Sequence, residues 1–178
     1  AIVSENCCRY VIADITISSG VGVVTPIDMN APEALMVTLL SKCDATAVLC
    51  DMEHLEPVIK AKESCPLIKS VITIDRKVEG YPFYEELVAK GKEMKGRSIY
   101  RNIELDLDAP AKILFTSGTT GANKGVVLSN ANLTANMVNC MDVILGAKEN
   151  TSMSILPMHH ATEINTHIMT RVGSGRLT

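Results

Sequence analysis

Hydroxyl-bearing residues and glycines cluster in the stretch ILFTSGTTGANKG, residues 113–125, and a lysine follows them. The residues that carry this chemistry are Thr116, Ser117, Gly118, Thr119, Thr120, Gly121 and Lys124. Hydroxyl groups donate hydrogen bonds to phosphate oxygens, glycines let consecutive backbone N–H groups turn toward one anion, and lysine adds a positive charge. The pattern indicates a phosphate-binding loop. The alternative is a polar turn between two apolar strands, because turns use the same residue types.

Two common phosphate-binding motifs do not describe this loop. The Walker pattern has glycine directly before its lysine and serine or threonine after it, whereas Asn123 precedes Lys124 and Gly125 follows it. The dinucleotide-binding pattern needs a third glycine, which is missing after Gly20 and Gly22. A phosphate loop here would therefore be of another kind.

A second group of candidate residues contains histidines. If residues 159–167 formed a helix, His160, Glu163 and His167 would share a face, as metal ligands can. However, the spacing of an H-E-x-x-H site is absent, and the preceding SILPM, residues 154–158, is typical of a strand. The pattern therefore predicts no metal ligand, and a packed histidine is the other interpretation of His160.

Composition and charge exclude several classes of protein. The 178 residues include 47% hydrophobic and 21% charged side chains, and the formal net charge is -3. These values are typical of a soluble globular domain and argue against a nucleic-acid partner. No apolar run approaches the ~18 residues of a membrane span. The six cysteines form no C-x-x-C pattern, which favours free thiols in a cytoplasmic protein over disulfides or a metal site.

Short β-type runs that alternate with helical patterns must position these candidate residues. Strands are predicted at 1–3, 21–27, 45–50, 68–74, 111–116 and 124–129, and from 153 to 157. Helices are predicted from Ser4 to about Ile17, from Pro32 to about Lys42, from about 51 to 62, from 84 to 92, and from Ser129 or Asn130 to near Leu145. The strands are continuous runs of Val, Ile and Leu, so both faces of the sheet should be buried. The sequence predicts an α/β fold with three layers and a doubly wound, mostly parallel sheet.

The stretch 113–125 resembles the phosphate-binding signature of the adenylate-forming (AMP-binding) enzymes, with Asn123 where that family usually has proline. The flanking sequence is similar as well. AIVSENCCRYVIADI and GVGVVTPID resemble an early strand–helix–strand of the family, and SILPMHHATE resembles the segment after the loop. The similarity covers essentially the whole chain, and the long-chain fatty acid–CoA ligases are the most similar subgroup.

The resemblance implies a two-step ligase that uses ATP, Mg²⁺ and coenzyme A. A carboxylate, expected to be a fatty acid, would attack the α-phosphate of ATP, and the thiol of coenzyme A would then accept the acyl group. By position, residues 116–121 would bind the β- and γ-phosphates. Lys124 would act as a catalytic counter-charge, and His160 would act beside the carboxylate.

The resemblance also implies that residues 1–178 are part of the family's N-terminal domain, with one subdomain at 1–150 and the start of the next at 151–178. The sequence lacks the Tyr-Gly-x-Thr-Glu segment, the ribose-binding aspartate and the C-terminal domain of the family. We therefore expect a fragment that is inactive alone and prone to self-association at open strand edges. The alternatives are a non-catalytic nucleotide-binding module and an adenylating enzyme with a different acceptor.

Overall fold

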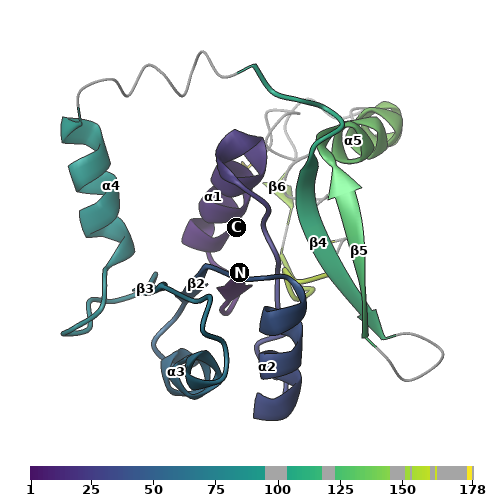
Figure 1. The fold of residues 1–178 in the computed structure, drawn as a ribbon. Helices are drawn as coiled ribbons and strands as arrows, with labels where there is room; N and C mark the ends of the chain where they lie inside the picture. The colour runs from purple at the N-terminus through teal and green to yellow at the C-terminus, as the bar shows by residue number, and fades with distance from the viewer. Residues whose placement is uncertain are drawn as a thin grey trace.

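The fold is that of a computed structural model. The structure describes residues 1–94, 104–117, 123–144, 151–152, 154–160, 163 and 176–177. The strands are β1 (Ile2–Val3), β2 (Ala47–Cys50), β3 (Ser70–Thr73), β4 (Pro110–Ser117), β5 (Asn123–Ser129), β6 (Thr151–Ser152) and β7 (Arg176–Leu177). The helices are α1 (Cys8–Thr16), a π-helical turn η1 (Ile17–Val21), α2 (Glu33–Lys42), α3 (Leu55–Glu63), α4 (Tyr84–Glu93) and α5 (Asn130–Ile144). Figure 1 shows their arrangement.

A parallel sheet forms the centre of the molecule. Its strands lie in the order β1-β2-β3, and Ile2 of β1 pairs with Leu49 of β2. The backbone of residues 24–27 continues this sheet, because the amide of Ile2 donates to the carbonyl of Thr25 at 3.0 Å. On its other side, Val24 forms a parallel bridge with Lys112 of β4. The parallel rows therefore run from β3 through β1 and residues 24–27 to β4.

Strand β5 lies antiparallel to β4 and is the outermost described strand on this side of the sheet. No strand pairs with the outer edge of β5 among the residues that the structure describes. Val126 and Val127 of β5 are both exposed. A short parallel pair, β6 with β7, forms separately.

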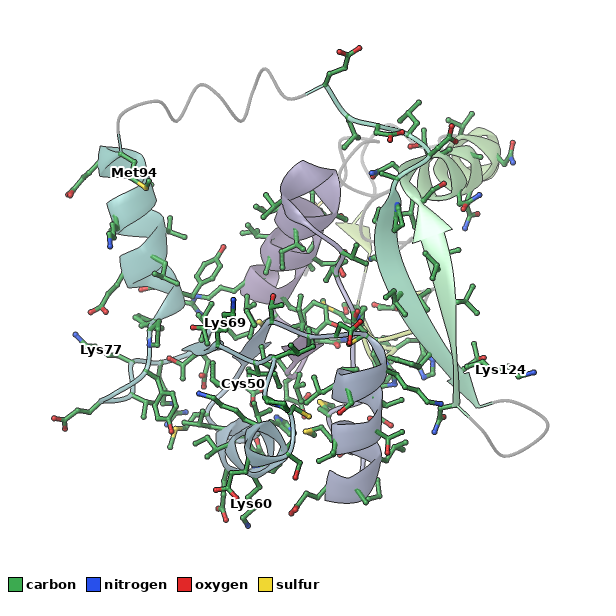
Figure 2. The ribbon with its side chains drawn as sticks, in the orientation of Figure 1. Cys50, Lys60, Lys69, Lys77, Met94 and Lys124 are labelled. Carbon is green, nitrogen blue, oxygen red and sulfur yellow. The ribbon has the colours of Figure 1, made fainter. Side chains whose placement is uncertain are left out.

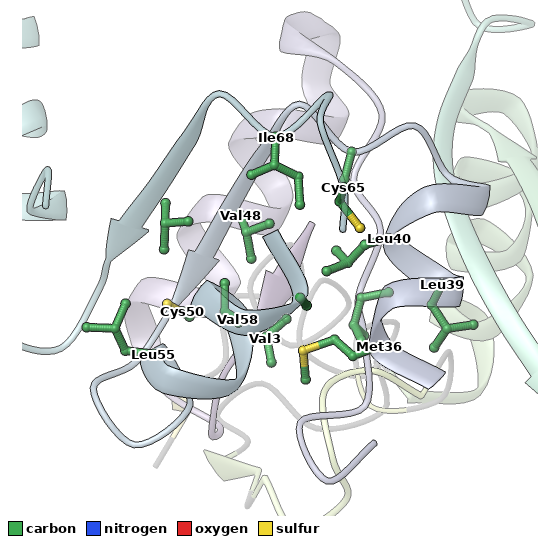
Figure 3. Close-up of a cluster of buried hydrophobic side chains, with 14 residues drawn as sticks. Val3, Met36, Leu39, Leu40, Val48, Cys50, Leu55, Val58, Cys65 and Ile68 are labelled. Atoms are coloured by element: carbon green, nitrogen blue, oxygen red, sulfur yellow. The ribbon is translucent and has the colours of Figure 1, made fainter. Parts of the chain in front are cut away.

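Helices cover both faces of the parallel sheet, which gives three layers. Consecutive residues of a strand point to opposite faces, and Val3 and Val48 accordingly pack in one core while Ile2 and Leu49 pack in the other. The larger core lies under α2 and α3 and contains Met36, Leu40, Val58 and other residues shown in Figure 3. The smaller core lies under α1 and includes Tyr10. The predicted α/β fold with a mostly parallel sheet is confirmed.

Three predicted elements differ from the structure. Cys7, not Ser4, caps α1, because its sulfur accepts a hydrogen bond from the amide of Tyr10 at 3.4 Å. The strand predicted at 21–27 is reduced to isolated bridges at Val24 and Pro26, since the preceding residues form η1. The strand predicted at 153–157 is wrong for residues 154–157, which form no strand.

Helix α4 is only loosely attached. It lies at the side of the molecule in Figure 1, and none of its side chains is buried. Ion pairs join it to the body, between Arg9 and Glu85 and between Lys77 and Glu86. Its exposed hydrophobic residues are Leu87 and Val88. At its start, partly buried Tyr84 packs against the smaller core and adds to these ion pairs.

Two further properties of the described residues are the character of the helices and the state of the cysteines. In this part of the chain, no helix has both the length and the apolar character needed to cross a membrane. Cys7, Cys8, Cys43, Cys50 and Cys65 carry free thiols. Burial, with Asp51 and Asp75 nearby, raises the pKa of the Cys50 thiol to about 12, so this group stays protonated at neutral pH.

Candidate functional site

The predicted phosphate loop joins the two strands of a hairpin. Thr116 of β4 pairs with Lys124 of β5, and Ser117 pairs with Asn123. Residues directly opposite each other in an antiparallel pair have side chains on the same face, with Cβ atoms ~5 Å apart. Both Thr116 and Lys124 are exposed, and Figure 2 shows Lys124 at the loop end of β5. The structure thus brings together a hydroxyl and an ammonium group where the loop begins and ends.

The central residues of the predicted loop cannot be placed in the same way. Gly118, Thr119, Thr120 and Gly121 lie outside the described residues. Their predicted contacts with phosphate therefore stay predictions. The antiparallel hairpin is also the setting that a simple polar turn would have, so the fold alone does not separate the two interpretations.

Strand β4 is held by its hydrophobic side chains. Ala111 and Leu114 are buried, and Phe115 packs against the larger core. Gly125 lies opposite Phe115 in the hairpin. A Cβ atom at Gly125 would lie 3.1 Å from Cγ2 of Ile113 and 3.3 Å from Cε1 of Phe115. Glycine therefore allows the close approach of these side chains at the base of the loop.

Helix α2 also contacts the hairpin. The Nζ atom of Lys42, in the last turn of α2, donates a hydrogen bond to the carbonyl of Asn123 at 2.9 Å. Asn123 is the first residue of β5 after the predicted loop. This contact fixes the position of the loop's end relative to α2, and nothing in the sequence distinguishes Lys42 from other lysines near helix ends.

A buried ion pair lies beneath the hairpin. Nζ of Lys112 in β4 lies 2.6 Å from Oδ1 of Asp14 in α1, and the two side chains are 1% and 3% exposed. Burial lowers the pKa of Lys112 and raises that of Asp14, and the attraction between the two charges opposes both shifts. The sequence signal is a charged residue inside an apolar run, in AKILF and in VIADITI. That signal marks Lys112 and Asp14 as unusual residues, although it does not indicate that they form an ion pair.

The segment 154–160 that carries the predicted histidine is anchored at the start of α1. The side-chain amide of Asn6 donates to the carbonyl of Leu156 at 2.8 Å, and its oxygen accepts a hydrogen bond from the amide of Met158 at 3.0 Å. Met158 is buried in the smaller core. Asn6 was not among the predicted site residues, because an isolated asparagine in a loop gives no recognisable signal.

The two adjacent histidines have different surroundings. His160 is exposed, and its ring centroid lies 4.4 Å from that of His159. His159 is less exposed, and its Nε2 atom lies 4.0 Å from Oδ1 of Asp28. Burial lowers the pKa of His159, although Asp28 opposes this effect. His159 is thus favoured in its neutral form, and His160 is the one open to solvent.

The predicted site residues are only partly brought together. No hydrogen bond or ion pair joins His160 to Thr116 or Lys124 in the part of the chain that the structure describes. Glu163 is buried, while His167 lies outside the described residues. Among those described, no group of three or more His, Cys, Asp or Glu side chains could hold a metal ion.

Strand direction nevertheless relates these segments to one another. The predicted loop follows the carboxyl end of β4, and Asn6 follows the carboxyl end of β1, which runs parallel to β4 through residues 24–27. Asp28 follows that intermediate row. Ligands in open α/β sheets bind outside the carboxyl ends of the strands. The carboxyl end of β4, Asp28 and the histidine segment therefore share the edge where this kind of fold places a ligand.

A family model described as AMP-binding enzyme matches residues 1–176 of the chain. Luciferin 4-monooxygenase from Photuris pensylvanica is 25% identical over 179 residues, which cover 93% of this chain and 32% of that protein. Long chain acyl-CoA synthetase 6, peroxisomal, from Arabidopsis thaliana is 27% identical over 174 residues, which cover 91% of this chain and 24% of that protein.

Solved structures show the same fold. The chain matches a long-chain-fatty-acid-CoA ligase from Archaeoglobus fulgidus with a TM-score of 0.85 and 20% identity. The match covers 99% of this chain and 34% of that one. The chain thus spans about a third or less of the length of these relatives.

Proposed function

The chain belongs to the AMP-binding enzyme family, and we propose from this membership that it is part of an ATP-dependent ligase that activates a carboxylate. The observation that carries the proposal is the match of residues 1–176 to the AMP-binding enzyme family, and the pairing of Thr116 with Lys124 across the ends of the loop agrees with it. A hydroxyl and an ammonium group on one face suit the binding of a polyphosphate. The Thr, Ser and Gly residues between them supply the remaining donors.

In the proposed reaction, an oxygen of the carboxylate attacks the α-phosphorus of ATP. A bond from carboxylate to phosphorus forms, the bond to pyrophosphate breaks, and the acyl-adenylate results. Residues 116–121 would hold the β- and γ-phosphates, and Lys124 would offset the negative charge that develops on the departing pyrophosphate. The acyl group would then pass from AMP to a thiol.

The roles of the remaining groups follow from the same proposal. His160, exposed beside His159, would contact the carboxylate end of the substrate. Mg²⁺ would accompany ATP and neutralise phosphate charge.

The substrate and acceptor are proposed to be a fatty acid and coenzyme A. The resemblance of the loop and its flanking segments to fatty acid–CoA ligases supports this choice, as does the acyl-CoA synthetase among the relatives. A luciferin 4-monooxygenase is a relative of similar identity, so an adenylating enzyme with another acceptor is the alternative. Residues 1–150 and 151–178 would belong to two subdomains of an N-terminal domain, in a protein of the cytoplasm.

Exchange of labelled pyrophosphate into ATP tests the first step in the protein encoded by the complete reading frame. We expect Lys124→Ala to lower kcat/KM for ATP roughly 10²-fold, because one charged contact to the leaving group is lost. Lys60→Ala is the control, since Lys60 is an exposed lysine on α3 that pairs with Glu56. Equal exchange by the two variants would show that Lys124 does not bind phosphate.

The same measurement separates an enzyme from a binding module. Binding of ATP by the complete protein with no exchange for any carboxylate would favour a non-catalytic nucleotide-binding role. Exchange that depends on a fatty acid, followed by formation of its coenzyme A thioester, would support the full proposal. Exchange with no thioester would indicate a different acceptor.

A further inference from the structure

The Asp14–Lys112 ion pair is unusual because both charges are buried and because it connects distant parts of the chain. The hydrogen bond between Nζ and Oδ1 measures 2.6 Å and joins residues 98 positions apart. It is the contact between α1 and the strand that leads into the predicted phosphate loop. Lys112, Leu114 and Thr116 alternate along β4 and therefore share a face of the sheet.

Stability alone gives a weak reason for this pair. Removing two charges from water costs free energy that their attraction only partly offsets, and apolar residues of similar volume often do as well. Here the polar groups are also incompletely bonded. The second carboxylate oxygen of Asp14 and the hydroxyl of the neighbouring Tyr10 are buried and have no hydrogen-bond partner among the described residues. Such a cluster suggests a role in specificity.

The position of Lys112 indicates that the pair specifies the register of β4. The residues on either side of it bond to the same partner: the carbonyl of Ala111 accepts a hydrogen bond from the amide of Val24, and the amide of Ile113 donates to the carbonyl of Val24, each at 3.0 Å. Directly before Lys112, the pairing of β4 with β5 shifts register between Pro110 and Lys112. An irregularity of this kind locally disrupts the ladder with β5 beside Lys112.

A slip of one residue would have large consequences. It would move every side chain of β4 to the opposite face of the sheet. Lys112 would then face the larger hydrophobic core, away from Asp14. Thr116 and its pairing partner Lys124 would move to the opposite face of the sheet as well. The Asp14 carboxylate can therefore pair with Lys112 only when β4 has its observed register against residues 24–27.

We propose that the Asp14–Lys112 ion pair fixes the register of β4 against residues 24–27 and thereby positions Thr116 and its partner Lys124 for ATP. Asp14 and Lys112 are positioning residues, since they act through the strand. The second part of this inference rests on the proposed function; the first part does not.

The test replaces the pair by apolar residues of similar size, in the double variant D14L/K112M of the complete protein. Hydrogen exchange of the Val24 and Ile113 amides reports the junction directly. We expect exchange at both to become at least tenfold faster, while the Leu49 amide, which bonds to the carbonyl of Ala1 in the same sheet, keeps its protection. KM for ATP should rise about tenfold, and KM for the carboxylate should change less than twofold.

Y10F is the matched control, because it removes a buried hydroxyl from the same cluster and leaves the ion pair intact. It should behave as the unmodified protein in both measurements. Unchanged protection of Val24 and Ile113 in D14L/K112M overturns the register role, and an unchanged KM for ATP overturns the positioning role. If the unmodified protein does not exchange pyrophosphate into ATP, the proposed function is contradicted. The register role would still be decided by hydrogen exchange at the Val24 and Ile113 amides.

Discussion

Asp51 illustrates how one carboxylate can organise the carboxyl edge of the sheet. Its oxygens accept hydrogen bonds from the amide of Glu5 at 2.7 Å, the amide of His54 at 3.0 Å and the ring of His54 at 2.6 Å. Burial by itself would raise the pKa of Asp51, but these hydrogen bonds outweigh it and the pKa is lowered. The loops after β1 and β2 are therefore tied to an ionised carboxylate.

This arrangement predicts a pH-dependent effect of Asp51→Asn. Because the folded pKa lies below the unfolded value of ~3.9, the stabilisation is complete above about pH 4 and is lost as the pH falls through the folded pKa. We expect the variant to lose about 1–3 kcal/mol in free energy of unfolding at pH 7, and less at pH 3. Urea denaturation at both pH values measures this. The exposed neighbour provides the control Glu53→Gln, and a deficit of equal size at both pH values would contradict the assignment.

At the scale of elements, the β4–β5 hairpin depends on a glycine for its packing. Ala in place of Gly125 would bring a methyl group within 3.1 Å of Cγ2 of Ile113 and 3.3 Å of Cε1 of Phe115. These side chains are part of the strand that carries the loop, so they have little freedom to move. We expect Gly125→Ala to lower the free energy of unfolding by about 1 kcal/mol, as overpacking does.

Gly91 in α4 offers the matched substitution. A Cβ atom there would have no atom within 4 Å, and alanine favours a helix by about 1 kcal/mol relative to glycine. Thermal unfolding should therefore show Gly125→Ala and Gly91→Ala shifting in opposite directions, or Gly91→Ala unchanged if α4 opens separately. Stabilisation by Gly125→Ala would show that the hairpin accommodates the methyl group.

Elements with a strong local pattern were predictable from the sequence. Pro32 at the start of α2, and Ser129 before α5, where its hydroxyl accepts a hydrogen bond from the amide of Asn132 at 3.3 Å, use side chains that favour helix starts. The cap of α1 was missed because a cysteine sulfur is a weak acceptor. Residues 154–157 look like a strand, but Asn6 bonds to the carbonyl of Leu156 in place of a neighbouring strand.

The candidate site was predictable in composition and only partly in geometry. The hydroxyls, the glycines and Lys124 are visible in one short stretch. Their spacing does not reveal that Thr116 and Lys124 face each other, because hairpin register depends on the turn that joins the strands. Lys42, which bonds to Asn123, and Asp14, which pairs with Lys112, lie in helices far from the hairpin in the sequence. Such contacts follow from tertiary structure, which no local pattern encodes.

At the scale of the molecule, the hairpin is joined to the parallel sheet by few polar contacts of different kinds. The backbone of Val24 bonds to β4, Lys42 reaches Asn123, and Lys112 pairs with Asp14. The bond from Lys42 is exposed, whereas the Lys112–Asp14 pair is a buried contact between two charged side chains. The docking of the proposed ATP-binding part onto the rest of the domain should therefore respond most strongly to the charge state of this pair.

The single variant Lys112→Met tests this dependence through pH. Without its partner, Asp14 would be a buried carboxyl group, and burial already raises its pKa. A raised folded pKa means that stability is greatest below the unfolded value of ~3.9 and is lost as the pH rises toward the folded pKa. We expect the variant to be less stable than the unmodified protein by about 3–5 kcal/mol at pH 7, because an unpaired charge is buried.

Chemical denaturation at pH 7 and pH 4 should show this deficit in the free energy of unfolding shrinking at the lower pH. The double variant D14L/K112M carries no charge at either position of the pair, so its difference from Lys112→Met should fall as the pH is lowered. A difference independent of pH would mean that Asp14 is not the group that titrates.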